Sequence, residues 1–524
     1  MDQDKLLKKR LGVWSLTAAA LGGVIGSGWL FGAMFAAQDA GPESIIGWVV
    51  GAIIFGLVAL VFSELAIVKP ESGSLVRYPM YTNGSLVASM IGWGMWLAYS
   101  SNPPTEASGI VQYLSKFFPG VYNGSQLTIG GIFLAILIMA VFVVINYYGV
   151  SLFAKTNLVV TAIKFVVPTL TLVGLLLSGF HPQNFVAHGG FAPYGWSAGL
   201  SIIATAGIVF AYTGFNAAMD LSGEAINPQR DVPRAVLLTI IIAVVLYVLL
   251  EIAFIGAVPV KDLSQGWHGV NFKSPFAELA LSLNIMWLYW MIIADAMVSP
   301  AGSALVYTAG NARNVFGLAK NKFFPSYFNS VNEKQGIPTR ALILNFIIGL
   351  LFLVPLKSWH SIIGVSGVLG VFVFSSAAVS VLVFIRAGVT RLEQRIKGIN
   401  VIAPLSFIGG SLIIYWAKWD RLEGAITLIL VGVVLYFITF ILNKETIKEI
   451  YGGAWIVVYL IALMVMSKLG SFGGIKLIKA PWDSVVVALV SLVFYYWATS
   501  AGEKYMLSKE GKASDVRNSV SSIG

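Results

Sequence analysis

Three ionisable residues, Glu106, Lys164 and Asp295, lie well inside long apolar stretches of the sequence. A charged side chain at the centre of a bilayer costs roughly 2.5–3.5 kcal/mol on insertion scales, so such a residue needs a partner or a function. A lysine removed from water can bind and release a proton near neutral pH, and a buried carboxylate can do the same. For Lys164 and Glu106 these residue types indicate proton transfer, and for all three residues a structural role is the alternative.

The structural alternative differs among the three residues. Lys164 can form a static salt bridge or extend its ammonium group to the membrane surface. Glu106, which follows two prolines, can line a transport pathway or neutralise Lys164 permanently. Asp295, with Ser299 one turn below it, can line the pathway or hydrogen-bond to a neighbouring helix.

Two of the apolar stretches are interrupted near their centres by small residues. Where a helix unwinds inside a membrane, its freed N–H groups can bind a carboxylate and its freed C=O groups can accept from an ammonium group. The two segments therefore predict a pocket that suits both ends of an α-amino acid, whereas close helix packing is the alternative for either segment alone. The predicted binding residues are Val24, Ile25, Gly26, Ser27 and Gly28 in the first segment, and Val209, Phe210, Ala211, Tyr212 and Gly214 in the second.

Aromatic residues accompany both segments. Trp29 follows the first, and Tyr212 and Phe215 lie in and after the second. Large rings are typical of the walls and gates of a binding site and equally typical of a packed core. We predict Trp29 and Phe215 as gate or pathway residues, together with Asp295 and Ser299.

The elements that must position these residues are membrane-spanning helices. About fourteen apolar stretches of roughly 18–27 residues recur along the 524-residue chain, and each can cross a hydrocarbon core of about 30 Å as a helix. The chain is 57% hydrophobic and 11% charged, which is too apolar for a water-covered surface. Because the stretches are continuously apolar rather than alternating, they exclude a transmembrane β-barrel. The sequence therefore predicts an all-α polytopic membrane protein.

The placement of basic residues predicts the orientation. An even number of helices puts both termini on one side of the membrane, and that side holds most of the 34 Lys and Arg residues. Since positively charged loops stay in the cytoplasm, we expect cytoplasmic termini in a multi-pass protein of the cell membrane. The net charge of +10 then faces anionic lipid, so we expect no nucleic-acid partner. With no cysteine and no histidines in metal-ligand spacing, we expect no metal site either.

The two interrupted stretches are the first and the sixth, so they cross the membrane in opposite directions. This arrangement is typical of two inverted repeats of five helices that meet at a central binding site. We therefore expect a ten-helix transport core over residues 1–386 and four additional helices over residues 387–503. Residues 504–524, rich in Ser and Lys, predict a disordered cytoplasmic tail.

Several motifs occur in a fixed order along the chain. They include Gly26-Ser27-Gly28-Trp29-Leu30-Phe31, Ser63-Glu64-Leu65, Ile163-Lys164, Phe210-Ala211-Tyr212-Thr213-Gly214-Phe215, Gly223-Glu224-Ala225-Ile226-Asn227-Pro228 and Gly336-Ile337-Pro338-Thr339-Arg340. This ordered set resembles the amino acid–polyamine–organocation (APC) superfamily of transporters. Within it, the chain is most similar to bacterial aspartate–proton symporters, through segments such as Arg77-Tyr78-Pro79 and Phe191-Ala192-Pro193-Tyr194-Gly195. The segment 212–216 departs from that group, which is more aliphatic there.

The resemblance implies a LeuT-like fold in which helices one and six are broken at the substrate site. It also implies that a proton is the coupling ion, because proton-coupled members place a lysine at the position of Lys164, where it stands in for a sodium ion. Glu106 is the second candidate for proton coupling. No other cofactor is implied.

We therefore expect a secondary active transporter of L-amino acids that works by proton-coupled symport, with aspartate or another small amino acid as substrate. Within transport, the alternative is an exchanger of one amino acid for another. A nutrient receptor or a channel on the same scaffold is a further alternative. An enzyme and an ATP-driven pump are not expected, because the sequence contains no nucleophile motif and no G-x-x-x-x-G-K-[ST] loop. The sequence indicates no oligomeric state.

Overall fold

The computed structural model is built of helices and describes residues 10–68, 74–148, 150–332, 336–389, 396–442 and 448–521. Among these residues, ten helical segments are long and apolar enough to cross a membrane, or eleven when one bent pair is taken as a single span. One of the ten, Gly28–Val68, combines two helices, and Val13–Val24 and Ala454–Leu469 are shorter apolar helices. The all-α polytopic class is confirmed, and the predicted number of about fourteen spans is approximate.

The first half of the core contains five predicted crossings. They are formed by α1 (Val13–Val24) with α2 (Gly28–Ala40), by α3 (Ser44–Val68), α5 (Ser85–Leu114), α6 (Ile129–Tyr148) and α7 (Val150–Ser178). A short helix, α4 (Ser74–Thr82), lies between α3 and α5. Helix α5 continues through Pro103 and Pro104, as membrane helices permit when neighbouring groups satisfy the freed carbonyls.

The second half of the core follows the same pattern. Its first crossing is divided into α8 (Trp196–Thr205), α9 (Ile208–Tyr212) and α10 (Ala217–Asp220). The next four crossings are α11 (Pro228–Ala257), α13 (Met286–Lys320), α14 (Thr339–Leu356) and α15 (Trp359–Arg386), with the short α12 (Pro275–Ser282) before α13. The loops contain the 3-10 helices Gly41–Glu43, Pro119–Val121, Pro182–Phe185, Ser222–Glu224, Val260–Leu263, Trp267–Gly269 and Ser326–Phe328.

Equivalent helices of the two predicted repeats lie side by side. Helix α3 packs on α11, α5 on α13 and α6 on α14, which pairs helices two, three and four with helices seven, eight and nine. A twofold axis in the membrane plane brings the equivalent helices near it together, so this is the packing expected of inverted repeats. The broken helices also meet, since α1 contacts α10 and α2 contacts α9.

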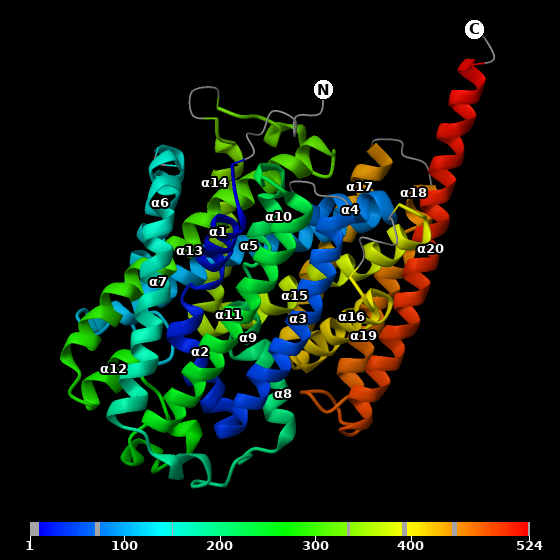
Figure 1. Cartoon of the computed structure of the whole chain (residues 1–524). Helices are drawn as coiled ribbons and strands as arrows, with labels where there is room; N and C mark the ends of the chain where they lie inside the picture. The colour runs from blue at the N-terminus through cyan, green and yellow to red at the C-terminus, as the bar shows by residue number, and fades with distance from the viewer. Residues whose placement is uncertain are drawn as a thin grey trace.

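The last part of the chain lies along one side of this core (Figure 1). It consists of α16 (Ile399–Trp416), α17 (Trp419–Leu442), α18 (Lys448–Tyr451), α19 (Ala454–Leu469) and α20 (Trp482–Ser521). Helix α16 packs on α15, α3 and α20, and α17 packs on α15 and α5. Helix α20 continues past residue 504, where the sequence predicts a disordered tail.

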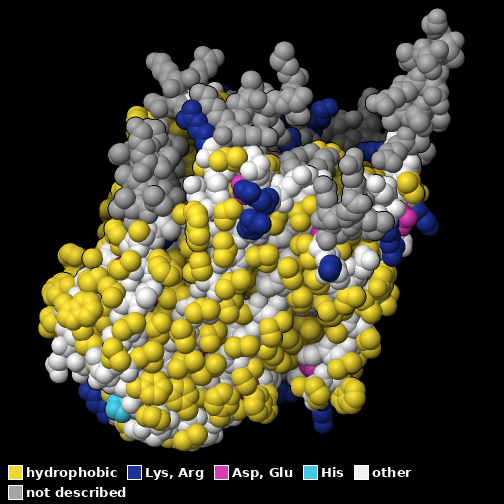
Figure 2. All heavy atoms as spheres, in the orientation of Figure 1, with side chains coloured by type: hydrophobic (Ala, Val, Ile, Leu, Met, Phe, Trp, Pro, Cys, Tyr) yellow, Lys and Arg dark blue, Asp and Glu magenta, His cyan; other side chains and the backbone are white. Residues whose placement is uncertain are grey.

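The surface agrees with a membrane environment. Figure 2 shows a broad face of hydrophobic side chains, with Lys and Arg side chains toward its two ends. Many exposed side chains on the long helices are large and apolar, among them Ile129, Phe133, Leu177, Leu351 and Val493. Such residues are stable against lipid and unfavourable against water, so the chain is a multi-pass membrane protein.

Candidate functional site

Helix one is broken at the predicted position. Helix α1 ends at Val24, Ile25 has an extended backbone (φ −86°, ψ 91°), and α2 begins at Gly28. Gly26 and Ser27 therefore lie between two half-helices whose terminal N–H and C=O groups lack their usual partners. The break provides backbone hydrogen-bonding groups inside the membrane-spanning part of the chain.

Helix six is broken twice. Helix α8 ends at Thr205, and Gly207 then adopts φ +97°, which glycine tolerates and other residues rarely adopt. Helix α9 ends at Tyr212, and Gly214 adopts φ +109° before α10 begins. The parts before and after Gly207 are bent by 54°. The break at Gly214 is the predicted one, whereas the break at Gly207 is seen only in the structure.

The two broken helices touch backbone to backbone. A Cβ atom on Gly214 would lie 2.7 Å from the nitrogen of Val24, and a Cβ atom on Gly28 would lie 3.2 Å from the Cα atom of Ala211. In this conformation the small residues serve close packing, the alternative that the sequence left open. No space for a ligand remains between Gly28 and Ala211, so a substrate can enter there only if the helices separate.

The carboxylate of Glu106 occupies the break in helix one. Its Oε2 atom accepts a hydrogen bond from the N–H group of Ser27 at 2.8 Å, and a Cβ atom on Gly26 would overlap its Oε1 atom. The hydroxyl of Ser27 accepts a second bond from Trp359 Nε1 at 2.6 Å. The carboxylate site predicted at this break is therefore occupied by the side chain of Glu106, which belongs to α5.

Lys164 points into the helix bundle. Its side chain is only 1% exposed, and its ammonium group donates to the carbonyl of Gly22 near the end of α1. It also lies beside α13, where a Cβ atom on Gly302 would be 3.3 Å from Nζ. The charges of Glu106 and Asp295 act on it. The structure thus brings the three predicted ionisable residues together, and Lys164 does not extend to the membrane surface.

Asp295 connects α13 to α2. Its carboxylate accepts hydrogen bonds from Ser299 Oγ at 2.7 Å and from Trp29 Nε1 at 3.1 Å. The Trp29 ring stacks on Phe276 with 5.5 Å between ring centroids. These contacts correspond to the bonding between helices that was the alternative for Asp295, and they hold Trp29 in the packed interior.

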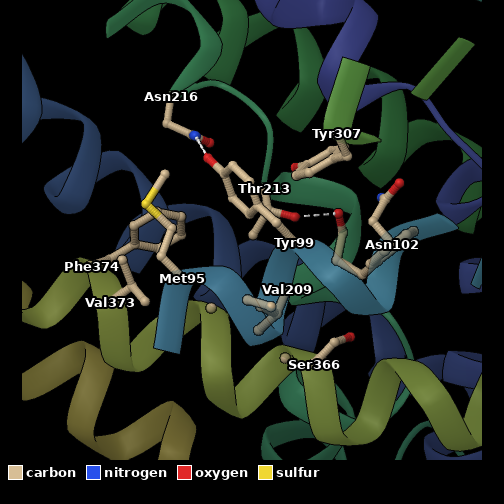
Figure 3. Close-up of a pocket in the computed structure, with 14 residues that line it drawn as sticks. Met95, Tyr99, Asn102, Val209, Thr213, Asn216, Tyr307, Ser366, Val373 and Phe374 are labelled. Atoms are coloured by element: carbon tan, nitrogen blue, oxygen red, sulfur yellow. Dashed lines mark hydrogen bonds between the residues drawn. The ribbon is translucent and has the colours of Figure 1, made fainter. Parts of the chain in front are cut away.

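A cavity lies beside the second half of helix six, between α5, α13 and α15 (Figure 3). Its volume is about 40 Å³, well below the roughly 300–1,000 Å³ of typical small-molecule sites, so a substrate fits there only after the surrounding helices move apart. The lining residues are Met95, Ala98, Tyr99, Asn102, Val209, Phe210, Thr213, Asn216, Tyr307, Ser366, Gly367, Gly370, Val373 and Phe374. The cavity is the candidate place for a bound substrate.

Only Val209 and Phe210 among the predicted binding residues line this cavity. Tyr212 instead packs against Trp48, Phe55 and Tyr247, and Phe215 packs against Phe55, Phe62 and Phe374. The reason is the direction of the side chains, because Tyr212 and Phe215 both point toward α3, which contributes no residue to the lining. Val24, Ile25, Gly26, Ser27, Gly28, Ala211 and Gly214 lie outside the lining as well.

Several lining residues were not predicted from the sequence. Tyr99 and Asn102 lie one turn apart on α5, and the Tyr99 hydroxyl accepts a hydrogen bond from the Asn216 amide (Figure 3). The Tyr99 ring meets Tyr307 of α13 edge-on at 5.0 Å. Polar residues inside apolar stretches are the signal that could have pointed to them, but many such residues only join helices.

Comparison with known proteins gives one family. A family model described as amino acid permease matches residues 11–466. The chain is similar to the glutamate/serine transporter AimA of Bacillus subtilis (strain 168), with 41% identity over 520 residues that cover 97% of this chain and 96% of that protein. It is also similar to the aspartate-proton symporter of Bacillus subtilis (strain 168), with 32% identity over 518 residues that cover 96% of this chain and 98% of that protein.

The fold is similar to that of the manganese transporter of Eremococcus coleocola, solved in complex with an aromatic bis-isothiourea substituted compound. The TM-score is 0.54 and the identity 14%, and the match covers 96% of this chain and 99% of that chain. At this identity the likeness concerns the fold alone. It agrees with the LeuT-like architecture of two repeats with broken first helices.

Proposed function

Because the chain belongs to the amino acid permease family and is a secondary transporter of amino acids, we propose that it is a proton-coupled symporter of small L-amino acids. It is a transporter and not an enzyme. The names of its relatives make glutamate, serine and aspartate the first substrates to test.

The observation that carries this proposal is the position of Lys164 between two helices. Its ammonium group bonds to the Gly22 carbonyl of α1 and lies against Gly302 of α13. A charged donor makes a stronger hydrogen bond than a neutral one, so a proton on Lys164 stabilises this arrangement and its release weakens it. Proton binding on Lys164 then shifts the conformational equilibrium of helix one between the position seen here and a second position farther from Lys164. Helix one forms part of the site.

Glu106 couples this conformational equilibrium of helix one to substrate binding. Its carboxylate uses the Ser27 N–H group, so a substrate carboxylate can use this donor only after Glu106 has left it. A proton on Glu106 weakens that bond, because a charged acceptor is stronger than a neutral one. Proton binding and amino acid binding at Ser27 then favour each other, and such mutual coupling is what symport requires.

The proposal places the protein in the cell membrane with cytoplasmic termini. The excess of Lys and Arg on the side of the termini supports this orientation. In Figure 1 the beginning of α1 and the last turns of α20 lie toward the same end of the helix bundle.

Uptake into proteoliposomes tests the proposal. The purified protein is reconstituted, and uptake of labelled serine, alanine, aspartate and glutamate is measured with and without a pH gradient, acid outside. Accumulation that requires the gradient supports proton symport. Uptake that requires a second amino acid inside, whatever the pH, identifies an exchanger instead, and the absence of uptake of every amino acid contradicts the proposed function.

A further inference from the structure

The residues that line the cavity beside helix six indicate which substrate side chains fit there. This inference rests on the proposed function. All fourteen residues that line it are neutral. Its walls are mostly apolar, and its polar side chains are Tyr99, Asn102, Thr213, Asn216, Tyr307 and Ser366. A charged group that moves from water into this mostly apolar cavity is stable there only with an opposite charge or several hydrogen bonds.

Two acids lie behind this lining, and each is paired with a cation outside it, Glu106 with Lys164 and Asp220 with Arg313. Asp220 of α10 acts on the phenol groups of Tyr99 and Tyr307, and Glu106 acts on Tyr307. The cation that faces Asp220 is Arg313, which does not line the cavity. The carboxylate side chain of aspartate or glutamate would therefore find no cation in the lining to offset the loss of water. The electrostatic environment disfavours acidic substrates.

Most polar groups of the lining already have hydrogen-bond partners. Asn216 donates to the hydroxyl of Tyr99. The hydroxyl groups of Thr213 and Ser366 donate to carbonyls of their own segments at 2.8 Å and 3.2 Å. These groups shape the cavity but offer little unused bonding capacity.

Asn102 differs from the other polar residues of the lining. Its side chain is buried, and its Oδ1 atom has no hydrogen-bond partner among the described residues. It stands on the same face of α5 as Met95, Ala98 and Tyr99, all of which line the cavity (Figure 3). An unpaired buried amide oxygen is unfavourable, so a ligand that brings a donor to it gains affinity.

We infer that the cavity selects amino acids with a small, uncharged side chain that carries a hydroxyl donor, as in serine and threonine, and that Asn102 is the specificity-determining residue. Met95, Val209, Val373 and Phe374 limit the length of this side chain. Aspartate and glutamate are poor substrates for the reasons of charge given above.

Competition binding in detergent tests the substrate class with the unmodified protein. Labelled serine is displaced by unlabelled serine, threonine, alanine, aspartate or glutamate. We expect threonine to compete like serine, alanine about tenfold more weakly because it leaves Asn102 unpaired, and the two acidic amino acids at least about a hundredfold more weakly. Equal competition by aspartate or glutamate, or no binding of serine, would overturn the inference.

Replacement of Asn102 tests the residue. Asn102→Leu keeps a similar volume without hydrogen-bonding groups, so the ratio of serine to alanine affinity should fall about tenfold. A merely structural role would lower both affinities and leave their ratio unchanged. Asn146→Leu is the matched control, because Asn146 is a buried amide of α6 that bonds to the carbonyl of Leu305 and lies outside the lining. A serine preference that persists in Asn102→Leu contradicts the assignment.

The outcome is separable from that of the proposed function. Binding in detergent involves no proton gradient, so it reports the side-chain preference alone. If serine binds but a pH gradient does not drive its uptake, the coupling is wrong and the side-chain preference stands. If glutamate binds as tightly as serine and a gradient drives its uptake, the transport proposal stands and the preference is wrong. Should Asn102→Leu not fold, the competition series with the unmodified protein still decides the substrate class.

Discussion

Replacing Lys164 by methionine should uncouple transport from the pH gradient. Methionine keeps an unbranched side chain in the space beside Val160 and Gly302 but removes the ammonium group that bonds to the Gly22 carbonyl. Loss of a hydrogen bond to a charged group costs about 1.5–3 kcal/mol, so the variant should be less stable but still fold. The cavity beside helix six, which Lys164 does not line, should remain available to substrate.

The expected loss of accumulation can be calculated if Lys164 carries one proton for each substrate molecule. A pH difference of one unit corresponds to about 1.4 kcal/mol, or a factor of ten in an equilibrium ratio. With acid outside, the unmodified protein should accumulate substrate about tenfold per pH unit and about a hundredfold at two units. The Lys164→Met variant should reach an inside-to-outside ratio of about one at either gradient.

The assay is the steady-state ratio of labelled substrate in proteoliposomes at gradients of zero, one and two pH units. Exchange of labelled for unlabelled substrate without a gradient serves as the control for folding, and it should persist in the variant. Lys164→Arg should also give a ratio of about one, because a guanidinium group does not release its proton at these pH values. Tenfold accumulation by either variant at one pH unit would refute the role of Lys164 and leave Glu106 as the next candidate for the proton carrier.

Three further predictions concern the two broken helices. Gly28→Leu should abolish amino acid binding, measured by titration calorimetry, because its side chain would push α2 away from Ala211, which a Cβ atom at residue 28 already approaches at 3.2 Å. Glu106→Gln keeps the shape of the side chain without its charge, so the rate of uptake should depend less on external pH, and an unchanged pH profile would count against a coupling role. Trp359→Phe removes the 2.6 Å hydrogen bond to Ser27, which should lower stability by about 0.5–1.5 kcal/mol and shift the thermal unfolding midpoint downward, while an unaltered midpoint would show that the bond contributes nothing.

Much of the fold could be predicted from the sequence because it depends on local composition. A continuous apolar run long enough to cross a bilayer has to be helical there, since no water is present to bond an exposed backbone. The break in helix one at Ile25 and the break in helix six at Gly214 were predictable for a related reason, because glycines and neighbouring small residues mark where a membrane helix can unwind. The ionisable residues Lys164 and Glu106 could also be identified, since any charge inside an apolar run is conspicuous.

The partners of these residues were decided only by the tertiary structure. Nothing local indicates that the Ser27 N–H group bonds to Glu106, or that Trp359, which follows more than three hundred positions later, bonds to the Ser27 hydroxyl. Nor does composition show that Thr213 lines the cavity while Tyr212 joins the aromatic core. Which neighbour points where depends on the rotation of a short helical segment between two breaks, and contacts with the surrounding helices set that rotation. The chain's own sequence therefore indicates where the helices run and where the breaks near Ile25 and Gly214 lie, whereas the break at Gly207 and the set of side chains that line the cavity are seen only in the tertiary structure.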